Sequence, residues 1–167
     1  MKFYLQVLKK YAVFSGRASR QEFWMFFLFN IIVSIGLSIT DRILGTRYIY
    51  YIPSGVSVPI GYIDSLYGLL VFIPNLAVQV RRLHDQNKSG KLLLLFFFVP
   101  MALAFLAFVS GSLGLLLLLG FVILGLCIWL LVLFCMPGTT GPNKYGEDPN
   151  GGGFKFSFEE GGDVKEE

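Results

Sequence analysis

Residues 92–136 read LLLLFFFVPMALAFLAFVSGSLGLLLLLGFVILGLCIWLLVLFCM, and this stretch decides the fold. Its 45 residues include no Lys, Arg, Asp or Glu. A helix that rises about 1.5 Å per residue crosses a hydrocarbon core of about 30 Å with roughly 20 residues. The stretch is therefore long enough for two membrane spans. Small residues between 110 and 114 predict the turn, with spans near 92–109 and 113–136.

Two further apolar runs precede this stretch. Residues 23–40 carry no charge, and the uncharged run 65–80 reaches spanning length when the residues from Ile60 are added, giving a span near 60–80. The whole chain is 54% hydrophobic and 15% charged, whereas a soluble domain has about 25% charged residues. The sequence predicts an all-α membrane protein with about four transmembrane helices in a domain over 23–136.

The two ends of the chain differ from this apolar domain. Residues 1–22 are basic and aromatic with apolar residues at helical spacing, which predicts an amphipathic helix at the membrane interface; a frayed terminus is the alternative. Residues 137–149 form a turn-rich segment, and the acidic, glycine-rich tail 150–167 is expected to be disordered.

The distribution of Lys and Arg predicts the orientation. Segment 1–22 holds five of them, segment 81–91 holds four and the C-terminal tail holds three, while residues 41–64 hold two. Positively charged flanks are retained in the cytoplasm, so both termini and the middle loop of this multi-pass protein are expected there. Four tyrosines of the opposite loop suit the far headgroup region: Tyr48, Tyr50, Tyr51 and Tyr62.

The first charged segment, FSGRASRQEFW at 14–24, precedes the first span. Ser19 and Glu22 have the spacing of a capping box, in which each side chain bonds a backbone amide at the helix start. Arg17 and Arg20 are expected at headgroup level, where phosphate is their natural partner.

The second segment, VRRLHDQNKSG at 80–90, follows the second span. Its cations Arg81, Arg82 and Lys88 suit lipid phosphates. His84 beside Asp85 offers a general base with an orienting carboxylate. Adjacent side chains on a helix point about 100° apart, which favours the alternative of a structural ion pair from Asp85 to Arg17, Arg20 or Arg81.

The third segment, PGTTGPNKYGEDP at 137–149, predicts an ordered turn built on Pro137, Gly138 and Gly141. It lacks the pattern of a Walker phosphate loop. Cys127 and Cys135 are eight residues apart on one predicted helix, which excludes a disulfide between them. With a single histidine, the sequence predicts no metal and no cofactor.

Polar groups inside the spans are few. Asn30 and Asn75 lie at similar depths in the first two spans, and a hydrogen bond between them is predicted. Pro74 is expected to kink the second span and to free the carbonyl of Leu70. These residues suggest packing or a cavity.

The three charged segments, in this order and each at a helix end, closely resemble the bacterial inner-membrane family called domain of unknown function 805. The resemblance covers residues 14 to about 149, and its signature positions include Arg17, Arg82, Asp85 and Gly138. Members of that family look like small inner-membrane proteins with no agreed activity. This chain departs from the pattern at Lys91, where members often have tryptophan, and its stretch 92–136 exceeds the single span of shorter members.

Three classes of function follow. The first is a non-enzymatic membrane component that binds anionic lipid headgroups or a partner protein through Arg17, Arg20, Arg81, Arg82, His84, Asp85 and Lys88. The second is a small oligomeric transporter, although the acidic residues all lie at span boundaries. The third is an enzyme acting on a phosphorylated lipid. A homo-oligomer or a membrane-protein partner is compatible with each class, and no nucleic-acid partner is expected.

Overall fold

The computed structural model describes residues 2–51 and 57–149, so the tail 150–167, predicted to be disordered, lies outside the described residues. Within these described residues, five helices and two strands follow one another: α1 Lys2–Lys9, α2 Arg20–Leu44, β1 Arg47–Tyr51, β2 Ser57–Gly61, α3 Tyr62–Asp85, α4 Leu92–Ser110 and α5 Leu113–Cys135.

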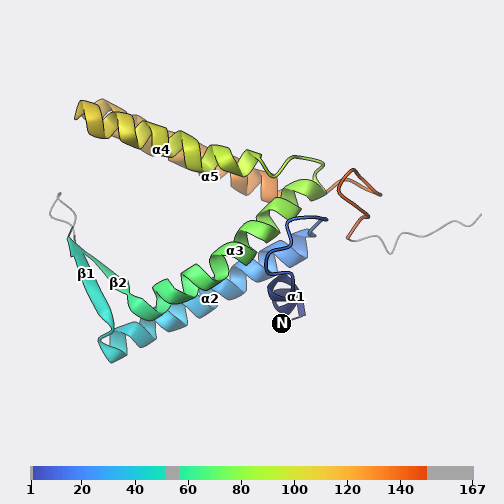
Figure 1. The fold of residues 1–167 in the computed structure, drawn as a ribbon, viewed down its shortest axis with the longest axis horizontal. Coiled ribbons are helices and arrows are strands. Elements are labelled where there is room, and N and C mark those ends of the chain that lie inside the picture. Colours follow the sequence, from blue (N-terminus) through green and yellow to red (C-terminus); the bar gives the residue numbers. More distant parts are fainter. Residues whose placement is uncertain (1, 52–56, 150–167) are drawn as a thin grey trace, which may run out of the picture.

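The four longest helices, α2 to α5, are long and apolar enough to cross a membrane, which confirms the predicted fold class. They form two antiparallel pairs, α2 with α3 and α4 with α5. Figure 1 shows that the pairs lie close together at one end and diverge along their length, so the molecule has the outline of a V. The joined end carries residues 16–20, 81–90 and 135–148, and we call it the charged end.

The far end of α2 and α3 is joined by a β-hairpin that the sequence did not predict. β1 and β2 pair antiparallel, from Arg47 opposite Gly61 to Tyr51 opposite Ser57. Aromatic and β-branched residues favour extended backbone, and α2 ends at Gly45 in the left-handed conformation with φ of 68°. The tyrosines of β1 remain exposed.

Asp41 fixes the start of α3 from the last turns of α2. Its buried carboxylate accepts hydrogen bonds from the backbone N–H groups of Ile63 and Asp64, at 3.2 and 3.0 Å. Gly61 precedes α3 and offers no side-chain cap, so Asp41 satisfies amides that the helix itself leaves unpaired. A methyl group on Gly61 would overlap the Asp41 carboxylate, which explains the glycine.

Helix α1 packs against the α2–α3 pair near the charged end (Figure 1). Val7 is fully buried, and the Tyr4 ring stacks on Phe26 with centroids 5.4 Å apart. The apolar side of α1 is therefore in contact with protein. Its predicted position at the membrane interface stays a prediction.

The predicted hydrogen bond between Asn30 and Asn75 was wrong. Asn30 accepts a hydrogen bond from the Tyr67 hydroxyl at 2.6 Å, and Asn75 accepts one from Gln79 at 3.2 Å. Tyr67 is long enough to reach across the helix pair, so it takes the place opposite Asn30, while Gln79 is one helical turn from Asn75. Both asparagines nevertheless line one groove between α2 and α3.

Pro74 lies inside α3 and removes the N–H that would bond the carbonyl of Leu70. The Tyr11 hydroxyl donates to that carbonyl at 2.6 Å. The segment after α1 thus satisfies a backbone group that the proline leaves free, and it ties residues 10–13 to the middle of α3.

The Tyr67–Asn30 bond gives a testable prediction. Tyr67→Phe leaves the Asn30 carbonyl oxygen without its donor inside a span, and we expect a loss of about 0.6–2 kcal/mol in unfolding free energy, measured in mixed detergent–SDS micelles. The control is Tyr62→Phe, at an exposed ring near the hairpin. Equal stability of the two variants would show that the bond contributes nothing.

Candidate functional site

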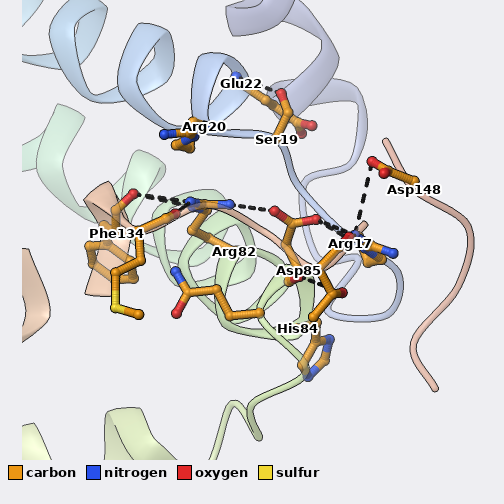
Figure 2. Close-up of polar contacts among 12 residues, drawn as sticks. Arg17, Ser19, Arg20, Glu22, Arg82, His84, Asp85, Phe134 and Asp148 are labelled. Atoms are coloured by element: carbon orange, nitrogen blue, oxygen red, sulfur yellow. Dashed lines mark hydrogen bonds and ion pairs between the residues drawn. The ribbon is translucent and has the colours of Figure 1, made fainter. Parts of the chain in front are cut away.

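The three charged segments, far apart in sequence, meet at the charged end. Residues 16–19 lead into α2, residues 81–85 end α3, and residues 134–148 leave α5. Figure 2 shows side chains from all three segments around Asp85. The site is therefore built by the ends of three spans together with the loops that continue them.

Asp85 lies at the centre and binds two arginines. One carboxylate oxygen accepts from the Arg17 guanidinium at 2.9 Å, and the other accepts from Arg82, one helical turn earlier on α3. All three side chains are buried, with at most 2% of each exposed. Buried charges need such pairing because their desolvation is costly. Of the ion pairs predicted for Asp85, the structure forms the one to Arg17, and Arg82 takes the place expected for Arg20 or Arg81.

The remaining N–H groups of these two arginines bind backbone carbonyls. Arg82 donates to the carbonyls of Phe134 and Met136 at the end of α5. Arg17 donates to the carbonyls of Thr139 and Gly141, at 2.5 and 2.6 Å. The last carbonyls of a helix have no partner within the helix, so Arg82 caps α5 while Arg17 fixes the loop beyond it.

Glu22 and Arg81 form a second buried pair. The Ser19 hydroxyl accepts from the Glu22 backbone N–H at 3.1 Å and begins α2, but the Glu22 carboxylate accepts from Arg81 at 2.8 Å. The capping box is therefore half formed, because the ion pair recruits the acid. The Arg81 carbonyl also accepts from the Ala18 N–H at 3.1 Å, which joins α3 to the start of α2.

His84 and Asp85 point to different partners. The His84 Nδ1 atom is 3.2 Å from the Gly16 carbonyl and donates to it, while the imidazole stacks on the Tyr145 ring at 3.8 Å. Asp85 does not orient the imidazole, so the geometry of a general base with its carboxylate is not formed. Among the described residues, no group of three or more His, Cys, Asp or Glu side chains is placed to hold a metal ion.

The segment 137–149 contributes contacts that sequence reasoning did not assign. The Asn143 amide donates to the His84 carbonyl and to the Thr139 hydroxyl, both at 2.9 Å. Thr139 in turn donates its N–H to the Asp85 carbonyl at 2.8 Å. A methyl group on Gly138 would overlap the Asp85 carboxylate, so close approach of the chain requires glycine there. The signature positions of the resembled family also include Asn143 and Tyr145, and this was the signal in the sequence that pointed to these contacts.

Arg20 differs from the other arginines of the charged end. Its side chain is exposed, and within the described residues its contact is one long hydrogen bond, 3.5 Å, to the Cys135 carbonyl. It lines a cavity of about 220 Å³ whose other walls come from Arg82, Asp85, Asp148 and residues 137–140. Figure 2 shows Arg20 beside Arg82 on one side of this region. Lys88 is partly exposed and is not among the lining residues.

Removing the carboxylate of Asp85 tests the role of the buried cluster. Asp85→Ala leaves two guanidinium groups buried without their acid, and we expect a loss of about 3–5 kcal/mol in unfolding free energy. Glu147→Ala, at an exposed acid of the same end, is the control and should change stability by less than about 1 kcal/mol. Similar effects of both substitutions in SDS titrations would contradict the assignment.

Comparisons with known proteins agree with this architecture. The family described as "Protein of unknown function (DUF805)" matches residues 11–147. Inner membrane protein YhaI of Escherichia coli K12 is 40% identical over 152 residues, which are 91% of this chain and 98% of that protein. Inner membrane protein YhaH of the same strain is 38% identical over 151 residues, 89% and 97% of the two chains. No solved structure matched significantly. The chain therefore belongs to the DUF805 family of membrane proteins of unknown function.

Proposed function

We propose that this protein is a non-enzymatic component of the bacterial inner membrane that binds the phosphate of an anionic phospholipid at Arg20. The relatives that carry the name inner membrane protein support the location. The excess of Lys and Arg on the charged side supports a cytoplasmic location for that end. The observation that supports an anionic ligand is the exposed guanidinium of Arg20, which lines a cavity at the ends of three spans.

Among the arginines of this end that the structure describes, Arg20 is the one without a carboxylate partner. In the described part of the chain, the guanidinium groups of Arg17, Arg81 and Arg82 are each paired with a carboxylate, and Arg20 has no such pair. An arginine presents several N–H donors in a plane that matches phosphate oxygens. The buried arginines of the predicted lipid site thus shape the cavity, while Arg20 contacts the lipid.

The charges around the cavity also favour an anion. Arg20 and Arg82 line the cavity together with Asp85 and Asp148, and Arg17, which lies outside the lining, pairs with both acids. Within this group of five side chains three positive charges oppose two negative ones, while Arg81 and Glu22 offset each other. One positive charge remains for a ligand. A phosphodiester carries one negative charge, which suits this excess better than a doubly charged phosphate monoester does.

The depth of the cavity relative to the membrane favours a lipid over a soluble phosphate as the ligand. Arg20 begins α2 and Cys135 ends α5, so the cavity lies where two spans leave the apolar layer. Trp24 follows one turn after Arg20, and such aromatic residues favour the headgroup region. Cytoplasmic leaflets carry anionic lipids that attract basic protein surfaces.

The other two classes of function have less support. Catalysis at His84 lacks the orienting contact from Asp85, since that acid binds two arginines. An oligomeric transporter would use ionisable groups at mid-membrane, whereas the buried acids Asp41 and Asp85 act as a helix cap and as the centre of an ion-pair cluster.

Lipid retention by Arg20 variants tests the proposal. Purified wild type and Arg20→Gln are compared by native mass spectrometry after exchange into phosphatidylglycerol or phosphatidylethanolamine. We expect wild type to retain phosphatidylglycerol preferentially and Arg20→Gln to retain about tenfold less, because a charge-assisted hydrogen bond contributes about 1.5–3 kcal/mol. Lys91→Gln, at an exposed cation of the same end outside the cavity, is the matched control.

Equal retention by Arg20→Gln and wild type would overturn the proposal. Equal loss in Arg20→Gln and Lys91→Gln would also overturn it, since it would show attraction by the general positive charge of this end. A protein subunit that co-purifies with wild type and is lost only in Arg20→Gln would assign the cavity to a partner protein instead.

A further inference from the structure

A groove of about 230 Å³ lies within the membrane-spanning part, between α2 and α3. Its apolar walls come from Phe27 and Ile31 of α2 and from Gly68 and Val71 of α3. Asn30, Ser34, Tyr67 and Asn75 add polar atoms. The groove is therefore amphiphilic, and nothing in the proposed headgroup contact at Arg20 accounts for it.

The α2 side of the groove faces the α4–α5 pair. Phe23 packs on Phe134 of α5 with ring centroids 4.4 Å apart, and Phe27 stacks on Phe23 one turn further along α2. Phe23, Phe27 and Ser34 are spaced by four and seven residues, which places them on one face of the helix. The face that touches α5 at the charged end is thus the face that lines the groove further out.

The α3 side of the groove also faces the α4–α5 pair. Arg82 binds the carbonyls at the end of α5, and Asn75 and Val71 lie seven and eleven residues before it, on one face of α3. Figure 1 shows α4 and α5 turning away from α2 and α3 beyond the charged end. The groove therefore opens into the wedge between the two helix pairs.

One polar group of the groove has an unused donor. The Asn75 side-chain oxygen accepts from Gln79, but within residues 2–51 and 57–149 its amide nitrogen makes no hydrogen bond. An unpaired amide in an apolar layer is costly. A pure hydrocarbon chain cannot satisfy it, whereas a molecule with both an apolar chain and a carbonyl acceptor can.

We infer that this groove holds an acyl chain of the phospholipid whose phosphate lies at Arg20, an inference that rests on the proposed function. Phe27 and Ser34 follow Arg20 by seven and fourteen residues, so the groove lies roughly 10–21 Å from Arg20 along α2. One leaflet of hydrocarbon is about 15 Å deep. A lipid anchored at Arg20 therefore places its chain beside the groove, in the same leaflet.

The positions of the polar groups in the groove agree with a lipid whose phosphate lies at the charged end and whose chain extends away from it. Asn75 is the α3 residue of the groove closest to the charged end, and the ester carbonyls of a phospholipid lie at the top of its chains. The amide donates to an ester oxygen, while the chain continues along Phe27, Ile31 and Val71. A second copy of this chain would also cover the wedge, and the oligomeric state of the variants distinguishes it from a lipid.

Filling the groove tests the inference. A Cβ atom on Gly68 meets nothing within 4 Å, so a side chain has room to begin there, and we expect Gly68→Leu to fill the groove. The matched control is Gly36→Leu, because Gly36 lies on α2 outside the groove and is equally open. The probe is phosphatidylglycerol with a photoreactive diazirine in the middle of one acyl chain, bound to the full-length protein in nanodiscs.

Peptide mapping after illumination reads out the position of the chain. We expect wild type and Gly36→Leu to be labelled on α2 and α3 peptides around Phe27 and Val71, and Gly68→Leu to lose at least tenfold of this labelling. Labelling spread evenly over all four spans, or unchanged in Gly68→Leu, would overturn the inference. A dimer in wild type that Gly68→Leu abolishes, without lipid labelling, would assign the groove to a second copy and would overturn it as well.

The experiments distinguish failure of the phosphate site at Arg20 from failure of the acyl-chain site in the groove. Loss of headgroup selectivity in Arg20→Gln together with unchanged groove labelling in Gly68→Leu would leave the phosphate site standing and remove the chain site. Groove labelling that is equal for phosphatidylglycerol and phosphatidylethanolamine, and lost in Gly68→Leu, would leave the chain site standing and remove the phosphate site.

Discussion

The structure depends on one buried carboxylate that two arginines share. Asp85 on α3 binds Arg17, which precedes α2, and Arg82, which reaches the end of α5. Each charge would be costly to bury alone, and together they are stable only when the three chain segments are in place. Gly138 lets the third segment approach this close. The cluster therefore joins helix ends that share little other contact, and the two helix pairs diverge beyond it (Figure 1).

This arrangement separates the arginines that are paired within the fold from Arg20, for which we propose a ligand. Four arginines occur within or next to the cluster, and three of them are paired with buried or partly buried acids. The fourth, Arg20, begins α2 with its side chain exposed in the cavity. The cluster around Asp85, in which most of these arginines are paired with acids, holds the two helix pairs together at one end. The wedge between the helix pairs results from this connection. The proposed headgroup site and the proposed chain site then share a single geometric cause.

The membrane fold could be predicted because long uncharged runs admit few alternatives, and the capping contact of Ser19 follows from local spacing. The Arg17–Asp85 pair was one of the predicted alternatives, whereas the partners of Arg81 and Arg82 could not be predicted. Arg81 and Arg82 are neighbours in sequence, yet their side chains point about 100° apart around α3 and bind different acids, Glu22 and Asp85. Contacts between residues that are separated in the sequence also determine the β-hairpin and the hydrogen bond from Tyr67 to Asn30. In the second case the longer tyrosine side chain takes the place of the predicted partner, Asn75.

A double-mutant cycle between Arg17 and Asp85 tests the central claim most directly. Unfolding free energies are measured in mixed micelles for Arg17→Ala, Asp85→Ala and the double variant. If the shared carboxylate joins the segments, the double variant loses much less stability than the two single variants combined, with a coupling energy of about 1.5–3 kcal/mol. Effects that add within about 0.5 kcal/mol would show that the two residues act independently, and the account of the charged end would be wrong.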